Sequence, residues 1–502
     1  MINVDRHTSF WGRPFKGGVH PESHKGLTSG RSGRAPLVTP KVLHLSLLLP
    51  NGGILKPLVK VGEEVVRGQI VAIGTHRNQA PLHSPVNGKV ESISPHITDH
   101  PGQLKIDAIH IKCFKDQTWG REFSSRPFNN LTSEEILQKI EDAGIIGLGG
   151  AGFSTAAKAR FAKRAKVQQL IINGGECEPY ISCDDFVMRS HSNEVIEGVR
   201  LLLKATGADE ALIGIESNKP ESFEAMTSAA ADDENIHVQM VPTVYPMGSA
   251  HHLTKTLTGK CVSHGQRSTD IGVIVNNVST ARAVYQAVRY NRPLVSKILT
   301  VSGQGIDNPM NVEVPLGTTV RDIIAYCGGT TLECERLIFG GPMMGQVVTH
   351  LDVPINKTTA ALLALTSHEI GSDQQQECIR CGQCVRACPM GLMPFQMKAA
   401  ASASNYELAE SLGINQCMSC GACSFICPSR VPLTEYFHHG KSVLSHNKQS
   451  KHRQEKAKAL SEARKIRLEK EAELKRAAKE AKKAKRKRGR SRASTNSEVV
   501  PS

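Results

Sequence analysis

Two short cysteine-rich runs constrain the fold of this 502-residue chain more than any other feature of its sequence. The runs read ECIRCGQCVRACPMG and QCMSCGACSFICPSR, and their first cysteines are 39 positions apart. Short spacers of two and three residues let one loop supply three thiolates to a single iron–sulfur cube. The cysteines are Cys378, Cys381, Cys384 and Cys388 in the first run and Cys417, Cys420, Cys423 and Cys427 in the second.

The spacing C-x2-C-x2-C-x3-C-P is that of bacterial ferredoxins, in which the fourth thiolate of a run reaches the other cluster. We therefore expect two 4Fe–4S clusters with crossed ligands. The expected ligand sets are Cys378, Cys381, Cys384 and Cys427 for one cluster and Cys417, Cys420, Cys423 and Cys388 for the other. A pair of zinc sites is the alternative, because C-x2-C is also zinc spacing. Most of the other six cysteines are expected to be small buried hydrophobic residues.

The composition limits where the chain can work. The sequence contains no run of about 18 apolar residues, so we expect no transmembrane helix. The N-terminus lacks the apolar segment of a secretory signal, which favours the cytosol, where thiols bind metal rather than pair. The formal charge of +15 lies in residues 441–492, which hold 21 Lys and Arg against 6 Glu, and the rest of the chain is balanced.

Residues 441–502 are predicted to form a basic Ala/Lys-rich helix and a disordered tail. Good helix formers and i,i+4 Glu–Lys pairs support the helix, but it lacks an apolar stripe. A solvated tail is the first interpretation, and an anionic membrane surface is the second. Nucleic acid is an unlikely partner, since no aromatic residue follows Phe437 to stack on bases.

The first third of the chain predicts a small all-β module. Residues 1–40 form an extended lead-in rich in Gly, Pro, Ser and His. Residues 41–115 alternate short β-branched strands with Gly and Pro turns, and they resemble the barrel-sandwich hammerhead of biotinyl and lipoyl domains. Lys89 lies just after the turn glycine and not at the hairpin tip, so we expect a structural module and not a carrier.

The remaining chain predicts a multidomain protein of α/β and α+β class. Residues 130–295 alternate apolar strand-like runs with helical stretches, which indicates an α/β domain. Residues 296–350 predict two strands, a turn and a helix, and they resemble a β-grasp SLBB domain. The cysteine runs lie within residues 368–437, where we expect a two-cluster ferredoxin-like helical domain.

Three polar loops of the α/β domain suggest a ligand site. The loop GIIGLGGAGFSTAAK (144–158) crowds four glycines before a helix expected to begin near Ser154, an arrangement that suits phosphate, although a tight turn is the alternative. The loops INGGECEPYISCDD and VNNVST each follow a predicted strand, so they converge on the crevice at the strand ends. Their amide and hydroxyl groups suit a flavin, and sheet capping by polar turns is the other interpretation.

These loops resemble a known family. The motifs GLGGAGFST…K, N…E.EP and VNNV.T are similar to the FMN- and NADH-binding subunit of respiratory complex I. The order of hammerhead, flavin fold, SLBB domain and two clusters, together with the opening FKGGVHP, resembles the C-subunit family of Rnf ion-translocating electron transport complexes over about residues 10–435.

The resemblance implies roles for individual residues, none of them a catalytic acid or base. FMN phosphate and ribityl would be held by Gly147, Gly149, Gly150, Gly152 and Lys158. The flavin would be contacted by Asn173, Asn276, Asn277 and Thr280. Phe153 and Glu178 would meet the nicotinamide nucleotide, and Glu176 is a further cofactor-binding candidate. The chain departs from the family pattern at Gly175, Ala250 and His251.

A flavin is needed because NADH gives up two electrons at once, whereas a 4Fe–4S cluster takes one. The resemblance thus implies an NADH-linked electron-entry subunit of a membrane-bound, ion-translocating Rnf-type complex with non-covalent FMN and two clusters. It would lie peripherally at the cytoplasmic side of the bacterial inner membrane. Its partners would be other subunits, NAD(H), and ferredoxin or flavodoxin as the distal redox partner. The alternatives are a soluble NADH diaphorase or dehydrogenase subunit and a nucleic-acid-binding protein with structural clusters.

Overall fold

The computed structural model describes most of the chain, with side chains up to residue 487. The described ranges are 15–28, 35–50, 52–76, 78–100, 102–128, 130–150, 152–263, 265–371 and 374–495. The predicted disordered tail after residue 495 lies outside them. The chain divides into two compact units, and each is described by itself: Met1–Gln396 with Gln416–Thr434, and Met397–Asn415 with Glu435–Ser502.

The predicted all-β module is confirmed as two small sheets around an apolar core that includes Leu43, Leu45 and Val71. Lys89 is exposed and lies opposite Glu64 within a strand. The four-stranded sheet has the order β1 (Val42–Ser46), β7 (Lys105–Cys113), β6 (Gly88–Ile97), β3 (Glu64–Val65). The three-stranded sheet has the order β2 (Lys56–Pro57), β4 (Ile70–Ile73), β5 (Leu82–His83).

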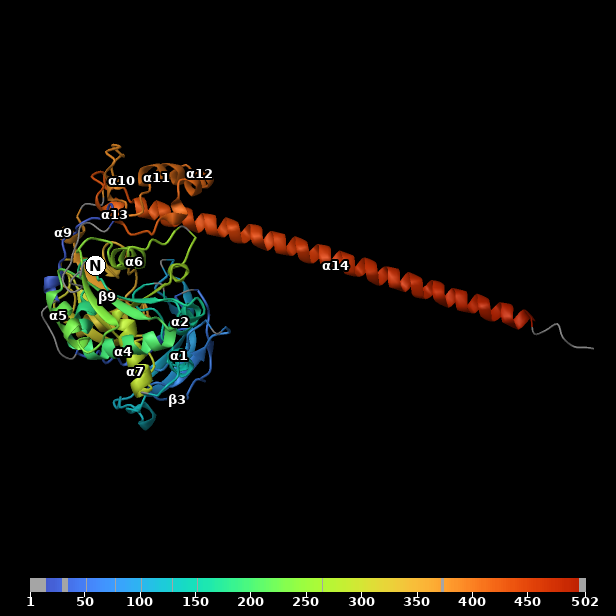
Figure 1. Ribbon diagram of the computed structural model, residues 1–502, viewed down its shortest axis with the longest axis horizontal. Coiled ribbons are helices and arrows are strands. Elements are labelled where there is room, and N and C mark those ends of the chain that lie inside the picture. The colour runs from blue at the N-terminus through green and yellow to red at the C-terminus, as the bar shows by residue number, and fades with distance from the viewer. Residues whose placement is uncertain are drawn as a thin grey trace, which may run out of the picture. The chain divides into compact units, whose positions relative to one another are not determined.

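The α/β domain contains a four-stranded sheet in which every pair of neighbouring strands is parallel. Its order is β10 (Ile236–Val241), β9 (Glu210–Glu216), β8 (Gln169–Gly174), β11 (Val273–Asn277). The helices are α1 (Ser133–Asp142), α2 (Thr155–Arg164), α3 (Cys183–Ser190), α4 (Ser192–Thr206), α5 (Pro220–Ala229), α6 (Ala250–Thr258) and α7 (Val278–Tyr290). Helix α4 packs along α7 (Figure 1).

The central strands β8 and β9 carry no polar side chain in their middle because both faces of the sheet are covered. Leu170 and Ile172 of β8 point into a core shared with the helices α1–α5 and α7. Ile171, between them, points to the other face and packs in a second cluster with Leu253 of α6 and with Phe15. Successive side chains of a strand alternate between faces, so a parallel sheet buried on both sides reads as an unbroken hydrophobic run.

The SLBB region forms a five-stranded sheet that extends past the predicted boundary at residue 350. Strand β16 lies in the middle of this sheet, parallel to β12 and with all six residues buried. The order is β13 (Met310–Pro315), β12 (Ser296–Ser302), β16 (Ala361–Thr366), β14 (Cys334–Phe339), β15 (Gln346–Val347). The helices of this region are α8 (Val320–Tyr326) and α9 (Ser367–Ile370).

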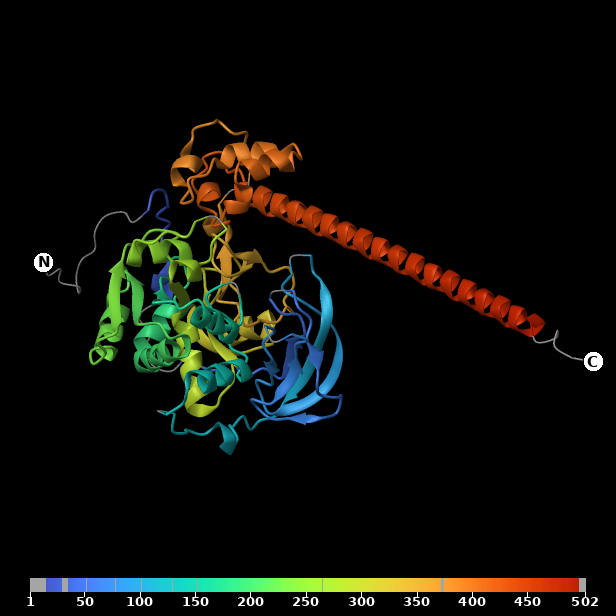
Figure 2. The same ribbon diagram turned by 45° about the vertical axis from the view of Figure 1, so that its right-hand side comes forward.

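The two cysteine runs fold as a pair of short helices, and Cys388 and Cys427 follow them closely. These helices are α10 (Gln383–Ala387) and α13 (Ala422–Phe425), and they pack against each other. The other helices are α11 (Pro394–Ser402), α12 (Tyr406–Ser411) and α14 (Leu433–Thr495). Helix α14 is a single continuous helix of 63 residues (Figure 2). Among the described residues, no helix is both long enough and apolar enough to cross a membrane.

Candidate functional site

The predicted polar loops meet at the carboxyl edge of the parallel sheet. Strands β8 and β11 are neighbours, and their register places Asn277 opposite Asn173 and Asn276 opposite Ile172. The Asn173 amide donates to the Gly248 carbonyl oxygen at 2.7 Å, while its own side-chain oxygen accepts from the Gly175 N–H at 2.9 Å. The loops after both strands are therefore fixed at one edge, where ligands of α/β sheets bind.

The glycine-rich loop closes on itself and is tied to the same edge. The Gly147 N–H donates to the Phe153 carbonyl oxygen at 2.9 Å. The Leu148 N–H donates to the buried Thr280 hydroxyl at 3.0 Å, which anchors the loop to the first turn of α7. Ser154 caps α2, accepting from the Ala157 N–H at 3.3 Å, so the predicted helix start is confirmed.

Glycine is required in this loop for two different physical reasons. A Cβ at Gly149 would lie 3.0 Å from the Cβ of Asn277, so the two loops approach each other closely. Gly150 has a φ of +146°, which side chains rarely adopt, yet a Cβ there meets no described atom within 4 Å. The loop is thus tight against the sheet at one residue and opens onto free space at the next, as a backbone cradle for a ligand requires.

Two buried nitrogen groups lie close to this cradle. Lys158 on α2 donates to the Val275 carbonyl oxygen, and burial lowers its pKa to about 8. The Asn276 side-chain nitrogen is buried and has no hydrogen-bond partner among the described residues. Buried donors normally have partners, so an unpaired one at a strand end indicates a ligand group. This donor set fits the phosphate, ribityl and ring oxygens of FMN.

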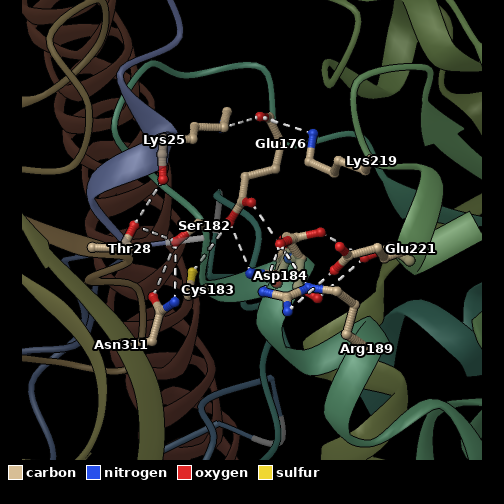
Figure 3. Close-up of polar contacts among 12 residues, drawn as sticks. Lys25, Thr28, Glu176, Ser182, Cys183, Asp184, Arg189, Lys219, Glu221 and Asn311 are labelled. Carbon is tan, nitrogen blue, oxygen red and sulfur yellow. Dashed lines mark hydrogen bonds and ion pairs between the residues drawn. The ribbon is translucent and has the colours of Figure 1, made fainter. Parts of the chain in front are cut away.

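The Glu176 carboxylate points toward the start of α3, where Cys183 and Asp184 lie (Figure 3). Its carboxylate accepts from the Asp184 N–H at 2.8 Å and the Asp185 N–H at 3.4 Å, and so caps α3. Asp184 in turn accepts from the Asn277 amide at 2.6 Å and the Ser279 hydroxyl at 2.7 Å. Burial raises the pKa of Glu176 to about 7. The three groups connect the loop after β8 to the loop after β11 through α3.

Part of the segment predicted to be an extended lead-in holds the loop after β8 in place. Lys25, in the short 3-10 helix η1 (Lys25–Leu27), donates to the backbone carbonyls of Glu176 at 2.7 Å and of Glu178 at 2.9 Å. Its pKa is lowered, chiefly by burial. Figure 3 shows Lys25 and Lys219 on either side of the Glu176 carbonyl oxygen. We name residues 15–28 the strap; the motif FKGGVHP was its only signal in the sequence.

The two residues expected to meet the nicotinamide nucleotide have different surroundings. Phe153 is 48 % exposed on the glycine-rich loop, so its ring is available for stacking. The Glu178 carboxylate accepts from the Met343 N–H at 3.1 Å, and its other oxygen lies 3.4 Å from the Tyr245 hydroxyl oxygen. Burial raises the pKa of Glu178 to about 7. Glu178 therefore links the loop after β8 to the SLBB region.

The cysteines gather into two groups that draw on both runs. Burial raises the pKa of the Cys384 thiol, and the neighbouring thiols of Cys378 and Cys427 raise it further. We name the group of Cys378, Cys381, Cys384 and Cys427 the outer site. Burial likewise raises the pKa of Cys420 to about 11 and of Cys423 to about 12, and the nearby Cys417 and Cys388 thiols add to both shifts. We name the group of Cys388, Cys417, Cys420 and Cys423 the inner site.

The inner and outer sites differ in burial and in their neighbours. Cys378 and Cys381 of the outer site are exposed, whereas Cys420 and Cys423 of the inner site are buried. The Tyr245 hydroxyl donates to the Cys420 carbonyl oxygen at 2.6 Å and also reaches Glu178. The inner site therefore adjoins the loops at the carboxyl edge of the sheet.

The other cysteines follow the sequence expectation only in part. Cys183 and Cys327 are buried, Cys113, Cys177 and Cys334 are half-buried, and Cys261 is exposed.

A shallow hollow of about 430 Å³ at the opposite edge of the sheet, where Gln168 and Glu210 lie, is remote from all the groups described above.

Comparison with known families matches each part of this architecture. The chain matches the Nuo51 FMN-binding domain over residues 140–286 and a 4Fe-4S dicluster domain over residues 377–431. It also matches the RnfC barrel sandwich hybrid domain over residues 13–116 and the SLBB domain over residues 298–347. The fold and site thus define a flavin- and iron–sulfur-binding oxidoreductase subunit, which confirms the expected cofactors.

Curated relatives give the family. The chain is 40% identical over 441 residues to the C subunit of the ion-translocating oxidoreductase complex of Rhodobacter capsulatus, covering 87% of this chain and 84% of that protein. The protein of the same name from Erwinia tasmaniensis is 38% identical over 94% of this chain and 58% of its own length. The chain belongs to the C-subunit family of ion-translocating oxidoreductase complexes, as the sequence motifs predicted.

Solved structures show a weaker likeness. The crystal structure of an NAD+-reducing [NiFe]-hydrogenase in the air-oxidized state matches with a TM-score of 0.46 and 21% identity, over 61% of this chain and 60% of that chain. This degree of likeness supports no conclusion about the present chain.

Proposed function

We propose that this chain is the NAD(H)-linked electron-entry subunit of an Rnf-type complex. The observation that carries the proposal is the position of Tyr245, whose hydroxyl donates to the Cys420 carbonyl oxygen of the inner site at 2.6 Å and lies 3.4 Å from the Glu178 carboxylate in the loop after β8. A flavin site and a cluster site joined by one buried side chain are arranged for electron exchange. The relatives named as ion-translocating oxidoreductase subunits favour this function over the diaphorase and nucleic-acid alternatives.

The carboxyl edge of the sheet would hold FMN without a covalent bond. The backbone of the glycine-rich loop and the Lys158 amine would bind the phosphate, while Asn276 would donate its unpaired N–H to the ligand. Asn173, Asn277 and Thr280 hold the surrounding loops in position through their own hydrogen bonds. Glu176 acts indirectly, through α3 and Asp184. When bound, FMN exchanges an electron pair with NAD(H) and single electrons with the clusters.

The crossed cysteine groups would hold the two clusters. The inner site lies against the flavin loops, and the outer site presents two exposed cysteines to solvent. Electrons would thus pass between the flavin loops and the outer site by way of the inner site. The exposed outer site is the surface where another subunit of the complex would exchange electrons with this chain, and a ferredoxin or flavodoxin would be the distal partner of the whole complex.

The chain would work as a peripheral subunit at the cytoplasmic face of the bacterial inner membrane. Docking on other subunits would hold it there. The basic helix α14 could add attraction to anionic lipid, and its described side chains beyond residue 450 are exposed.

The test of the flavin site compares two glycine variants. Gly150→Val places a side chain in the open space of the cradle, and Gly207→Val places one at the C-cap of α4, where φ is +74° and no described atom lies within 4 Å of a Cβ. We expect Gly150→Val to lose FMN, and with it NADH-dependent dye reduction, at least tenfold more than Gly207→Val. Flavin content after anaerobic purification is the measurement. Wild-type FMN affinity in folded Gly150→Val would show that the loop is only a turn.

A further inference from the structure

Three histidines gather on the outer face of the barrel-sandwich module, away from the flavin and cysteine sites. His44 lies on β1, His96 on β6 and His110 on β7. Each offers one ring nitrogen, and the three nitrogens lie within 4.8 Å of one another. All three residues are half-buried. Among the described residues, no other group of His, Cys, Asp or Glu side chains is as close.

The sheet itself brings these side chains together. His44 and His110 are directly opposite each other in the antiparallel pair of β1 and β7. Their flanking residues, such as Leu43 and Ile111, point into the core of the module, so alternation along each strand turns both histidines to the other face. The rings of His44 and His96 stack with centroids 4.2 Å apart, and the His110 ring stands edge-on to both.

Hydrogen bonds fix the proton on one of the rings. The His96 Nε2–H donates to the Asp352 carbonyl oxygen at 2.8 Å, because a carbonyl can only accept, so the neutral His96 ring carries its lone pair on Nδ1. His110 Nε2 lies 3.2 Å from the Ser94 hydroxyl, which can donate or accept, and 3.4 Å from the Ser94 carbonyl oxygen, which offers an acceptor for a His110 Nε2–H. A histidine that binds a metal usually donates its other N–H to such an oxygen.

The charge state of the cluster also suits a ligand role. Burial, with smaller contributions from His96 and His110, lowers the pKa of His44 to about 4. Burial lowers the pKa of His110 as well. Two acidic groups act in the opposite direction: Asp352 raises the pKa of His44, and Glu91 raises that of His110. Neutral imidazole is the form that binds metal ions.

We propose that His44, His96 and His110 form a binding site for a divalent transition-metal ion of the Zn2+ type. Three imidazole ligands suit zinc, copper or nickel, and a three-histidine set leaves a fourth position for water or another ligand. The site would brace the sheet of the module against the Asp352 loop of the SLBB region through His96.

Metal binding requires a small adjustment of the cluster. The Nδ1 atoms of His44 and His110 lie 2.6 Å apart, a distance at which one donates a hydrogen bond to the other. Two nitrogens on one tetrahedral zinc ion are about 3.3 Å apart, since each bond is about 2.0–2.1 Å. The rings would have to separate by roughly 0.7 Å, which side-chain rotation alone can supply. The alternative is a metal-free chain of hydrogen-bonded neutral imidazoles.

The experiment distinguishes these two states with Zn2+ as the probe. Anaerobically purified full-length holoprotein is titrated with Zn2+ by calorimetry, and retained zinc is counted after gel filtration. His96→Gln and His44→Gln each remove one ligand, and His100→Gln, an exposed histidine in the loop after β6, is the control. Iron and flavin contents show that each variant is folded and that zinc has not displaced a cluster.

We expect wild type and His100→Gln to bind one more Zn2+ per chain than either ligand variant, or to bind it at least tenfold more tightly. Zn2+ should also raise the melting temperature of wild type and not of the ligand variants. Equal zinc stoichiometry and affinity in wild type and the folded ligand variants would overturn the proposal and leave the hydrogen-bonded imidazole chain as the structure of the cluster.

Discussion

The inner and outer cysteine sites carry the same sequence motif, yet the fold gives them opposite environments. The inner site includes the buried Cys420 and Cys423, and the outer site includes the exposed Cys378 and Cys381. The inner environment comes from residues far away in the sequence: Val19 and Tyr245 pack in one hydrophobic cluster with Cys420. A ligand motif therefore specifies what is bound, while distant packing specifies how exposed the bound group is.

Replacing one cysteine ligand in each site should give the largest difference between the inner and outer sites. We expect Cys420→Ser to lose the inner cluster and to abolish reduction of the outer one by NADH, because the inner site adjoins the flavin loops through Tyr245 and would be the first to receive their electrons. Cys381→Ser should leave the inner cluster reducible. Iron should fall from about eight to about four atoms per chain in each variant. Electron paramagnetic resonance after NADH addition is the measurement.

A third variant tests the crossed grouping. Cys427→Ser should behave like Cys381→Ser, since its thiol lies near Cys384 of the other run. Cys334→Ser, outside both runs, should keep full iron. If Cys427→Ser instead disturbs the cluster of its sequence neighbours Cys420 and Cys423, the crossed grouping is wrong.

The difference in exposure should also appear as a difference in rate. With an iron chelator and air present, we expect the outer site of the wild-type protein to lose its iron several-fold faster than the inner one. Water and chelator reach Cys378 and Cys381 directly, whereas Cys420 and Cys423 are covered. Time-resolved iron release should therefore be biphasic with two nearly equal amplitudes. A single phase would contradict the distinction between the two sites.

The sequence predicted the local parts of these sites and missed the long-range ones. Cysteine spacing and the glycine-rich loop are local patterns, so the dicluster domain and the start of α2 near Ser154 were foreseeable. Two apolar strands each followed by polar residues predicted the meeting of Asn173 with Asn277. No local pattern shows that Glu176 turns to cap α3, because that depends on where α3 lies. The position of β16 within the SLBB sheet likewise depends on pairing with β12, a strand far away in the sequence.

Tyr245→Phe should weaken the inner site without touching the outer one. The change removes the donor to the Cys420 carbonyl oxygen and leaves that buried oxygen unpaired, which costs about 1–3 kcal/mol. We expect a lower denaturation midpoint and faster iron release from the inner site only. Tyr326→Phe, on the partly exposed tyrosine of α8, should change neither. Unchanged inner-site release would show that Tyr245 does not support the cluster.

Deleting residues 441–502 should have the smallest effect, because the exposed outer site and not the tail is expected to dock on partner subunits. Most of the truncated protein should remain in the membrane fraction when those subunits are present. Each basic residue near an anionic surface adds up to about 1 kcal/mol, strongly screened by salt. Sedimentation at low and high salt measures the contribution. Complete release of the truncated protein, with NADH oxidation surviving in solution, would make the tail the anchor.

The hydrogen bonds of the strap limit the order in which parts of the chain can fold during synthesis. The Gly18 N–H donates to the Ala387 carbonyl oxygen at 2.9 Å, and the Tyr180 N–H donates to the Ser23 carbonyl oxygen at 2.8 Å. Synthesis at about 5–20 residues per second delivers Ala387 roughly 20–70 s after Gly18. Until then the Gly18 end of the strap lacks its partner, whereas Lys25 can already support the loop after β8. The nascent chain therefore has a period in which the strap is fixed at one end only and its Gly18 end waits for the cluster segment to emerge.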